Sequence, residues 1–529
     1  MRRVLLVLAV AAAGCSKCGK QTAVGGKGVE AVLPAGANAY VIVPSVERLG
    51  QKLVQVEGFK VANFAVQATG FETAHAYVDA LVQDLGIDVR SKEQLDKIGI
   101  AADASAGVAV MDDDEVLIAL PIKDPGRIAA FIRTFSTNRL GASMVEDKEE
   151  NGVTVHRLVN AAGAKLAWTA KGGYALIVAR SGIDKLSGWA KESVETLAKD
   201  TSLPASLARM PAERDAIIYA PPRAAMMALP VSHAVITASL DAKALALNFD
   251  APWSGDKAGL SAFETSKAAV ALLGALPADA FLVARFAGEP SQLGTLVAPL
   301  LGKNLERAFS EGGFDLQAAL SQVLPGALLA LSLSPTAQMG GGVPDIDIRR
   351  TNPFAFVHLS GLAQVKSAEA AGPALGKLAE VAPRFGAQMT QREGVYVTTY
   401  AQGEGVHFAA KGDRVVFGSP LPRVKALLEA EVGAPALSPE LAAALDGSAI
   451  AMVVDLRRLS DSVRELPPSA WGIGGFAIKA TTVRWLDNSD DLRAVTLNVG
   501  AKGGALQGTL KLLLGAPGAA APAGGDAGP

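Results

Sequence analysis

Five short blocks of this sequence recur in the same order about 240 residues later. A repeat at nearly constant spacing constrains the fold strongly, because each copy is expected to form the same structural unit. The blocks begin at Leu33, Arg139, Gly152, Leu166 and Leu203, and their counterparts begin at Leu276, Arg384, Gly394, Val406 and Ser438. Chance can produce one such match in an alanine-rich chain, but five matches in the same order predict an internal duplication.

Within each copy, short apolar runs alternate with turn residues. The run from Ala39 to Val43 predicts a strand, and "AGVAVMDDDEVLIALPI" predicts a hairpin that turns at Asp112-Asp113-Asp114. Three more strands are expected between Val153 and Ala179. Apolar residues at helical spacing then predict a helix from Gly182 to Leu197. The closing strands expected in the second copy span Ala477 to Leu486, Arg493 to Val499 and Leu506 to Leu514.

Strands outnumber helices in this pattern and mostly arrive in adjacent pairs or triplets. This favours an α+β fold with two tandem duplicated domains, each a mostly antiparallel sheet with helices packed on one face. The tail after residue 514 is rich in Ala, Gly and Pro and is expected to be disordered. The expected segments are a signal peptide (1–14), a tether (15–30), a first repeat (31–252), a linker (253–269), a second repeat (270–514) and a tail (515–529).

The two copies share a motif order that resembles a family of exported bacterial proteins of unknown function. Each copy has a Leu-Pro turn, an apolar strand, a Gly-Val strand start and a Lys-Gly hairpin. The hairpin residues are Lys171-Gly172 in the first copy and Lys411-Gly412 in the second. The resemblance covers most of residues 33–514, rests on hydrophobic patterns and implies no catalytic residues.

The first fifteen residues have the three parts of a secretory signal. A basic head, Met1-Arg2-Arg3, precedes the apolar run Val4–Ala13, which is shorter than the roughly 20 residues of a membrane-spanning helix. Small residues then lead to Cys15. This resembles the lipobox of bacterial lipoproteins, which implies that a signal peptidase recognises Ala12, Ala13 and Gly14 and that Cys15 carries the lipid. An ordinary secretory signal beside a chance cysteine is the alternative.

Lipidation would make the bilayer the first partner of the chain. The resemblance implies a diacylglyceryl thioether on Cys15 and usually a third acyl chain on its amino group, and more than one chain makes the attachment lasting. Ser16 follows where aspartate would signal inner-membrane retention, so the outer membrane of the cell envelope is favoured. Because Cys18 is the only other cysteine, the body is expected to fold without internal disulfides.

The chemistry-bearing residues form no catalytic, cofactor or metal motif in the sequence. Lys and Arg (50) nearly balance Asp and Glu (52), which argues against a nucleic-acid partner. Ser254 to Lys257 forms a Ser-x-x-Lys, but the partner motifs of penicillin-recognising enzymes are missing. Two acidic clusters favour solvated hairpin turns over calcium sites: Asp112-Asp113-Asp114-Glu115, and Asp487 with Asp490-Asp491. The histidines are scattered: His75, His156, His233, His358 and His407.

These observations favour a membrane-anchored envelope lipoprotein with a non-enzymatic binding or structural role. Its partners would be the bilayer, through the Cys15 acyl chains, and an envelope protein or an apolar ligand. The alternative is a periplasmic carrier or sensor of apolar ligands such as lipids. A hydrolase is the third reading. No cofactor is expected.

We expect Cys15→Ala to abolish acylation and to release the protein from membranes, because the thioether requires this sulfur. Metabolic labelling with a fatty-acid analogue and membrane fractionation test this, with Cys18→Ala as the variant that keeps its label. Label that persists in Cys15→Ala would rule the lipobox assignment out.

Overall fold

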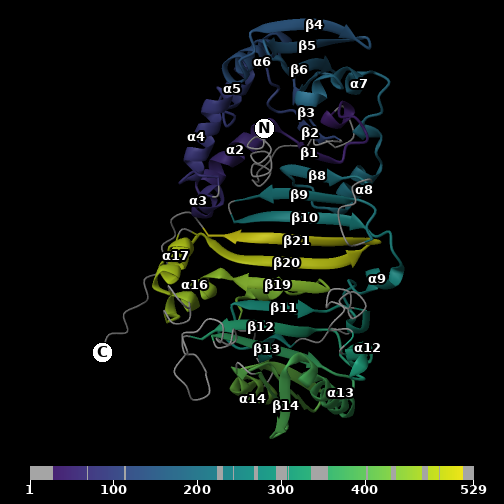
Figure 1. Ribbon diagram of the computed structural model, residues 1–529, viewed down its shortest axis with the longest axis vertical. Coiled ribbons are helices and arrows are strands. Elements are labelled where there is room, and N and C mark those ends of the chain that lie inside the picture. Colours follow the sequence, from purple (N-terminus) through teal and green to yellow (C-terminus); the bar gives the residue numbers. More distant parts are fainter. Residues whose placement is uncertain are drawn as a thin grey trace. The chain divides into compact units, whose positions relative to one another are not determined.

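Figure 1 shows the computed structural model of the chain. The described residues are 28–67, 69–111, 115–222, 230–241, 243–266, 272–292, 307, 309–334, 356–400, 403–430, 437–467, 475–487 and 489–515. The lipobox, Cys18, Asp112–Asp114 and the tail from residue 516 therefore lie outside the described part. Internal contacts divide the chain into unit 1 (1–254 with 514–529) and unit 2 (255–513).

Unit 1 is built on an antiparallel sheet whose first strand lies in the middle. β1 pairs with both β2 and β8, and the described order across the sheet is β10-β9-β8-β1-β2-β3-β7-β6-β5-β4. The strands are β1 Ala39–Val43, β2 Ala106–Val110, β3 Val116–Pro121, β4 Met144–Glu150, β5 Val153–Asn160, β6 Gly163–Lys171, β7 Tyr174–Ala179, β8 Ala216–Ala220, β9 Ala234–Leu240 and β10 Ala244–Pro252.

The helices of unit 1 begin mostly at side chains that accept from free backbone N–H groups. Ser45, Thr73, Ser91 and Asp124 are such N-caps, for α2, α4, α5 and α6 respectively. The helices are α2 Val46–Glu57, α3 Lys60–Gln67, α4 Ala74–Leu85, α5 Lys92–Lys97, α6 Pro125–Leu140, α7 Leu186–Ala190 and α8 Ser202–Arg209, with short 3₁₀ turns at Val29–Ala31, Arg180–Ile183 and Leu197–Lys199.

Both faces of the unit 1 sheet are buried by helices. Ala175 and Leu176 are consecutive in β7, so they point to opposite faces, and both are fully buried. Leu176 packs in one core with Leu186 of α7, whereas Ala175 packs in a second core with Ile128 of α6. The expectation that helices cover one face is therefore wrong for this unit. Both faces can be buried because the run "YALIVA" of β7 is apolar throughout and does not alternate with polar residues.

The strands of unit 2 also pair antiparallel, and the first of them, β11, again lies inside the order, between β19 and β12. The printed pairings give β20-β19-β11-β12-β13-β18-β17-β15-β14, with β16 also on β15. β21 follows β20 through the Gly503-Gly504 turn, and Figure 1 draws the two side by side. The strands are β11 Leu282–Phe286, β12 Ala327–Leu333, β13 Val357–Gln364, β14 Ala387–Arg392, β15 Val395–Tyr400, β16 Gly403–Glu404, β17 His407–Lys411, β18 Arg414–Ser419, β19 Ile450–Asp455, β20 Leu492–Lys502 and β21 Ala505–Leu514.

One face of the unit 2 sheet is covered by α14 and α15. Val424 of α14 packs against Leu362 and Val416, and Leu441 of α15 packs against Ala330 and Val453. The described helices of this unit are α9 Lys257–Ser261, α12 Leu316–Ser321, α13 Ala368–Val381, α14 Leu421–Glu429, α15 Pro439–Ala443, α16 Leu456–Glu465 and α17 Gly475–Asp487, with 3₁₀ turns at Leu273–Ala275 and Ala382–Phe385.

The two units have the same strand order when the strands of each unit are numbered along the chain from its own first strand. Equivalent hairpins also use the same backbone conformations. Positive φ angles occur at Asn151-Gly152 between β4 and β5, and at Glu393-Gly394 between β14 and β15. Positive φ recurs after the matching lysines, at Gly172 and at Gly412, where a residue with a Cβ would be strained.

Two sequence predictions about local structure are wrong. The expected strand Ala477–Leu486 lies within helix α17. The β-branched residues of this segment favour a strand, but intrinsic secondary-structure propensities are weak and tertiary contacts outweigh them. One such contact is the hydrogen bond from Lys479 Nζ to Arg464 O near the end of α16, at 2.7 Å. Asp487 is consequently the last residue of α17 and Asp490-Asp491 come just before β20, so this acidic cluster does not form a hairpin turn. The expected helix Gly182–Leu197 is also reduced to a 3₁₀ turn and α7, since glycines weaken it.

We expect Leu176→Ala to lower the free energy of unfolding by about 2–5 kcal/mol, because the lost side chain is fully buried and leaves a cavity. Leu140→Ala at the exposed end of α6 is the control and should cost within about 0.5 kcal/mol. Urea unfolding followed by circular dichroism measures both, and equal losses would contradict the burial of β7.

Candidate functional sites

The structure places the histidines in separate environments. His156 stacks on Trp168 and contacts Asp147 at 2.7 Å. His407 is fully buried, and its Nδ1 accepts from Thr398 N. No group of three or more His, Cys, Asp or Glu in the described part of the chain is arranged to hold a metal ion. Among the described residues, no helix is both long and apolar enough to cross a membrane.

The arrangement of Ser206 and His233 bears on the hydrolase reading. Ser206 Oγ lies 2.9 Å from His233 Nε2, which is the geometry of a nucleophile and its base. However, Ser206 is fully buried, and Arg209 of α8 also donates to its oxygen at 3.1 Å. Ser232, rather than a carboxylate, meets the other ring nitrogen. The network also includes the Arg209–Asp250 ion pair, so it fastens α8 to the sheet.

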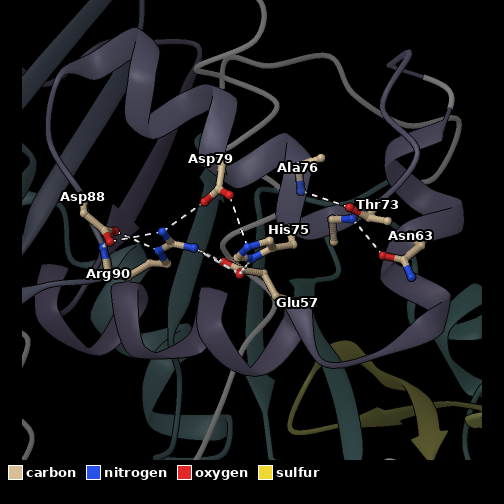
Figure 2. Close-up of polar contacts among 9 residues, drawn as sticks. Glu57, Asn63, Thr73, His75, Ala76, Asp79, Asp88 and Arg90 are labelled. Atoms are coloured by element: carbon tan, nitrogen blue, oxygen red, sulfur yellow. Dashed lines mark hydrogen bonds and ion pairs between the residues drawn. The ribbon is translucent and has the colours of Figure 1, made fainter.

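A charged cluster on the helices of unit 1 is the first candidate site (Figure 2). Arg90 donates to Asp88, Asp79 and Glu57, at 2.8 to 3.2 Å. His75 and Asp79 lie one turn apart on α4, and the two nitrogens of His75 lie 2.7 Å from Glu57 and 3.2 Å from Asp79. The cluster joins the end of α2 to α4 and to the loop that follows α4. We call it the His75 cluster.

The charges of the His75 cluster favour protonated His75. A neutral ring has one N–H, whereas both ring nitrogens here face carboxylates. The hydrogen bond to Glu57, together with the charge of Asp79, raises the pKa of His75 above its ordinary value. The Arg90 hydrogen bond likewise lowers the pKa of Asp88 against the opposing effect of burial. With His75 at 65 % exposure and Glu57 at 10 %, the cluster is a half-open ionic network.

A second polar cluster lies in unit 2, under the start of α14. Arg423 donates through both terminal nitrogens to Asp279, one bond measuring 2.9 Å, and Ser332 donates to the same carboxylate at 3.1 Å. Arg423 also donates to His358 Nδ1 at 3.1 Å. Ser332 and His358 are directly paired residues of β12 and β13, so they share one face of the sheet. We call Asp279, Ser332, His358, Ser360 and Arg423 the Arg423 cluster.

The contact with Arg423 decides the protonation of His358. An arginine only donates, so Nδ1 must accept and the ring proton must lie on Nε2. Burial and the charge of Arg423 lower the pKa of His358, which keeps the ring neutral. Burial raises the pKa of Asp279, but the bonds and charge of Arg423 outweigh it, so the pKa lies below its usual value.

Two polar atoms of the Arg423 cluster have no described partner. His358 Nε2 and Ser360 Oγ are both buried and form no hydrogen bond among the described residues, with exposures of 5 % and 1 % for the two residues. They lie two residues apart on the same face of β13. Buried donors without partners cost stability, so such a pair marks a place where an acceptor atom is expected.

The equivalent place in unit 1 holds a simpler ion pair. Glu115 and His358 occupy equivalent positions in the two units. The same series of strand pairings, counted outward from the first strand of each unit, leads to Glu115 in unit 1 and to His358 in unit 2. Glu115 is buried and bonds Lys185 at 2.8 Å. Lys185 immediately precedes buried Leu186 of α7, just as Arg423 immediately precedes buried Val424 of α14. Both units thus use a cation here to fasten a helix to the sheet.

Sequence reasoning missed both clusters. Asp279 and Arg423 are far apart in the chain, and no motif spacing connects them. A signal was nevertheless present in the repeat, because the first block aligns Asp279 with Gly36 of the first copy. The predicted lipobox residues Ala12, Ala13, Gly14 and Cys15 lie outside the described residues. Ser254 and Lys257 show no nucleophile geometry, and Ser254 N donates to Pro230 O.

Comparison with known proteins adds little to these sites. No family model matches the chain, and no curated protein matches it. Among solved structures, crystal form III of TP0453 is 11% identical, with 43% of this chain and 80% of that chain covered and a TM-score of 0.26. Crystal form I is 9% identical, covers 43% and 79%, and scores 0.25. At scores this low the likeness carries no argument about either fold or function.

We expect His75 to titrate above its ordinary pKa of 6.5, and Glu57→Gln to bring the value down by removing the first cause of the shift. Because the pKa is raised in the folded state, the protonated ring stabilises the fold below pH 6.5, and this contribution is lost as the pH rises through the folded pKa. NMR titration of the histidine ring protons measures this. Glu93→Gln, at an exposed position of α5, is the control. A wild-type value at or below 6.5 would contradict the geometry of the cluster.

Proposed function

We propose that this chain is a lipid-anchored protein of the bacterial cell envelope that acts by binding rather than by catalysis. The observation that carries the binding role is the Arg423 cluster, where a buried ring N–H and a buried hydroxyl share one sheet face without a described partner. Proteins retain unsatisfied buried polar groups at a stability cost, and such groups gather at functional sites.

The anchor in this proposal rests on the sequence of the first fifteen residues. Cys15, preceded by Ala12, Ala13 and Gly14, would hold the acyl chains, and the body would lie on the outer membrane more readily than on the inner one. The likeness to exported bacterial proteins of unknown function agrees with this location. It adds no ligand and no reaction.

We also propose that the two units arose by duplication. Their strand orders agree, and positive φ occurs at the matching glycines Gly152 and Gly394 and again at Gly172 and Gly412. Five sequence blocks recur in the same order. Duplication supports a binding role because it supplies two related scaffolds, of which one is free to change its buried polar residues.

The chain from Ser16 onward, produced without acylation, distinguishes this proposal from the apolar-ligand carrier. We expect native mass spectrometry of this protein to find no co-purifying lipid, because the sheet faces are filled by their own side chains, such as Leu362 and Val424 in unit 2. A stoichiometric bound lipid would replace the binding proposal with the carrier. The same protein after delipidation and refolding is the reference for the unliganded mass.

A further inference from the structure

Each unit has one strand, β4 or β14, that stands at the end of its strand order and is paired on one side. Among the described residues, β4 pairs only with β5 and β14 pairs only with β15. In an antiparallel strand, every second residue turns its N–H and C=O groups away from a given neighbour. On an end strand these groups form an edge on which another strand can pair, so proteins commonly protect such edges.

β4 is protected by its charges. Its sequence is MVEDKEE, in which four carboxylates and one lysine give a net charge of −3. Glu146, Asp147 and Glu149 are all exposed. A second β4 strand would bring the same excess of negative charge to this edge, and like charges on neighbouring strands are destabilising. The edge of unit 1 is therefore closed to a second copy of itself.

β14 lacks this protection although it follows the same repeat block as β4. This block ends at Met144 in unit 1 and at Met389 in unit 2. Two residues after these methionines, β4 has Glu146 whereas β14 has Gln391. The sequence of β14 is AQMTQR, so Arg392 is its one charged residue, and the strand contains neither proline nor glycine. None of the usual devices against strand pairing is present in it.

The free side of β14 is accessible, and the strand is already ordered. All six residues of β14 are in register with β15. Outside that pairing, no described backbone hydrogen bond involves residues 387–392. The exposed residues of the strand are Gln388, Thr390, Gln391 and Arg392. A strand that is fixed in its extended conformation can accept a second neighbour with little further loss of conformational entropy.

A second copy of the same chain is the partner that suits this edge. In antiparallel pairing about a two-fold axis through Thr390, this residue would meet its own copy, and Gln388 would meet Arg392 of the second copy. Threonine pairs favour adjacent strands, and no like charges are opposed in this register. An edge that recognises a foreign peptide adds pockets for alternate side chains. The side chains of β14 are instead mostly exposed.

We propose that this protein forms a dimer in which two copies pair antiparallel through β14, so that the sheets of their second units become continuous. This pairing uses the same strand of both copies and is closed at two. The charges of β4 support the same outcome, because a second open edge would let further copies add on. The proposal goes beyond the proposed binding role and does not depend on it.

Sedimentation equilibrium of the chain from Ser16 onward, produced without acylation, tests the dimer. We expect its dimer fraction to rise between about 1 and 100 µM, since pairing by one strand is a small interface. Thr390→Lys and Thr390→Glu should each raise the dissociation constant about tenfold or more, because like charges would meet at the two-fold axis. An equal mixture of the two variants should restore the dimer, because opposite charges then meet there.

Thr399→Lys is the matched control. Thr399 is an exposed threonine of β15, but it has a strand neighbour on both sides, Gln388 of β14 and Glu404 of β16. The substitution adds the same charge to the same sheet away from the free edge. The dissociation constant should therefore stay within about twofold of the value for the unchanged chain.

The proposal is overturned if the unchanged chain stays monomeric at a concentration on the order of 100 µM, which would leave this edge to a strand of another protein. It is also overturned if Thr390→Lys dimerises as tightly as the unchanged chain, or if Thr399→Lys weakens the dimer equally. A mixture of Thr390→Lys and Thr390→Glu that stays monomeric would contradict pairing through β14 in the same way.

Discussion

The register of the central strands determines where Ser332, His358 and Ser360 of the Arg423 cluster lie. β11 pairs Val283 with Ala330 of β12, which in turn pairs with Ser360 of β13. Ser332 and His358 follow two residues away along the same strands, and therefore face the same side of the sheet. A slip of one residue would turn these side chains to the opposite face and bring apolar ones to α14. The site thus depends on the apolar residues that fix this register.

Enclosed charges explain why each unit keeps a cation at the start of one helix. This cation is Lys185, just before α7, in unit 1 and Arg423, in the first turn of α14, in unit 2. An enclosed charge is costly without a partner, and the enclosed members of the two pairs are Glu115, at 3 % exposure, and Arg423, at 18 %. Glu115 and Lys185 meet this requirement in unit 1 with two residues. Unit 2 meets it with Asp279 and Arg423, so His358 is not needed to neutralise the arginine. Its neutral ring and free N–H are additional to what helix docking requires.

Strands and hairpins with clear local signals could be predicted from the sequence. The run Ala39–Val43 coincides with β1, and the hairpin expected around Asp112–Asp114 is confirmed by the pairing of β2 with β3. Helix α17 could not be predicted, because its β-branched residues favour a strand and its contact with the end of α16, through Lys479, exists only in the folded chain. The clusters were missed for a different reason. Arg90 and Glu57 are 33 residues apart and Arg423 and Asp279 are 144 apart, so only the fold brings them together.

The two clusters differ in what their geometry allows. The His75 cluster is closed upon itself, since Arg90 is shared among three carboxylates and His75 spans two of them. A ligand would have to break several ion pairs there and would find no unused donor in exchange. In the Arg423 cluster, by contrast, His358 Nε2 and Ser360 Oγ are buried without a described partner. On the proposed duplication, unit 1 fastens its helix with the simpler pair of Glu115 and Lys185, whereas unit 2 keeps buried polar groups that helix docking does not use.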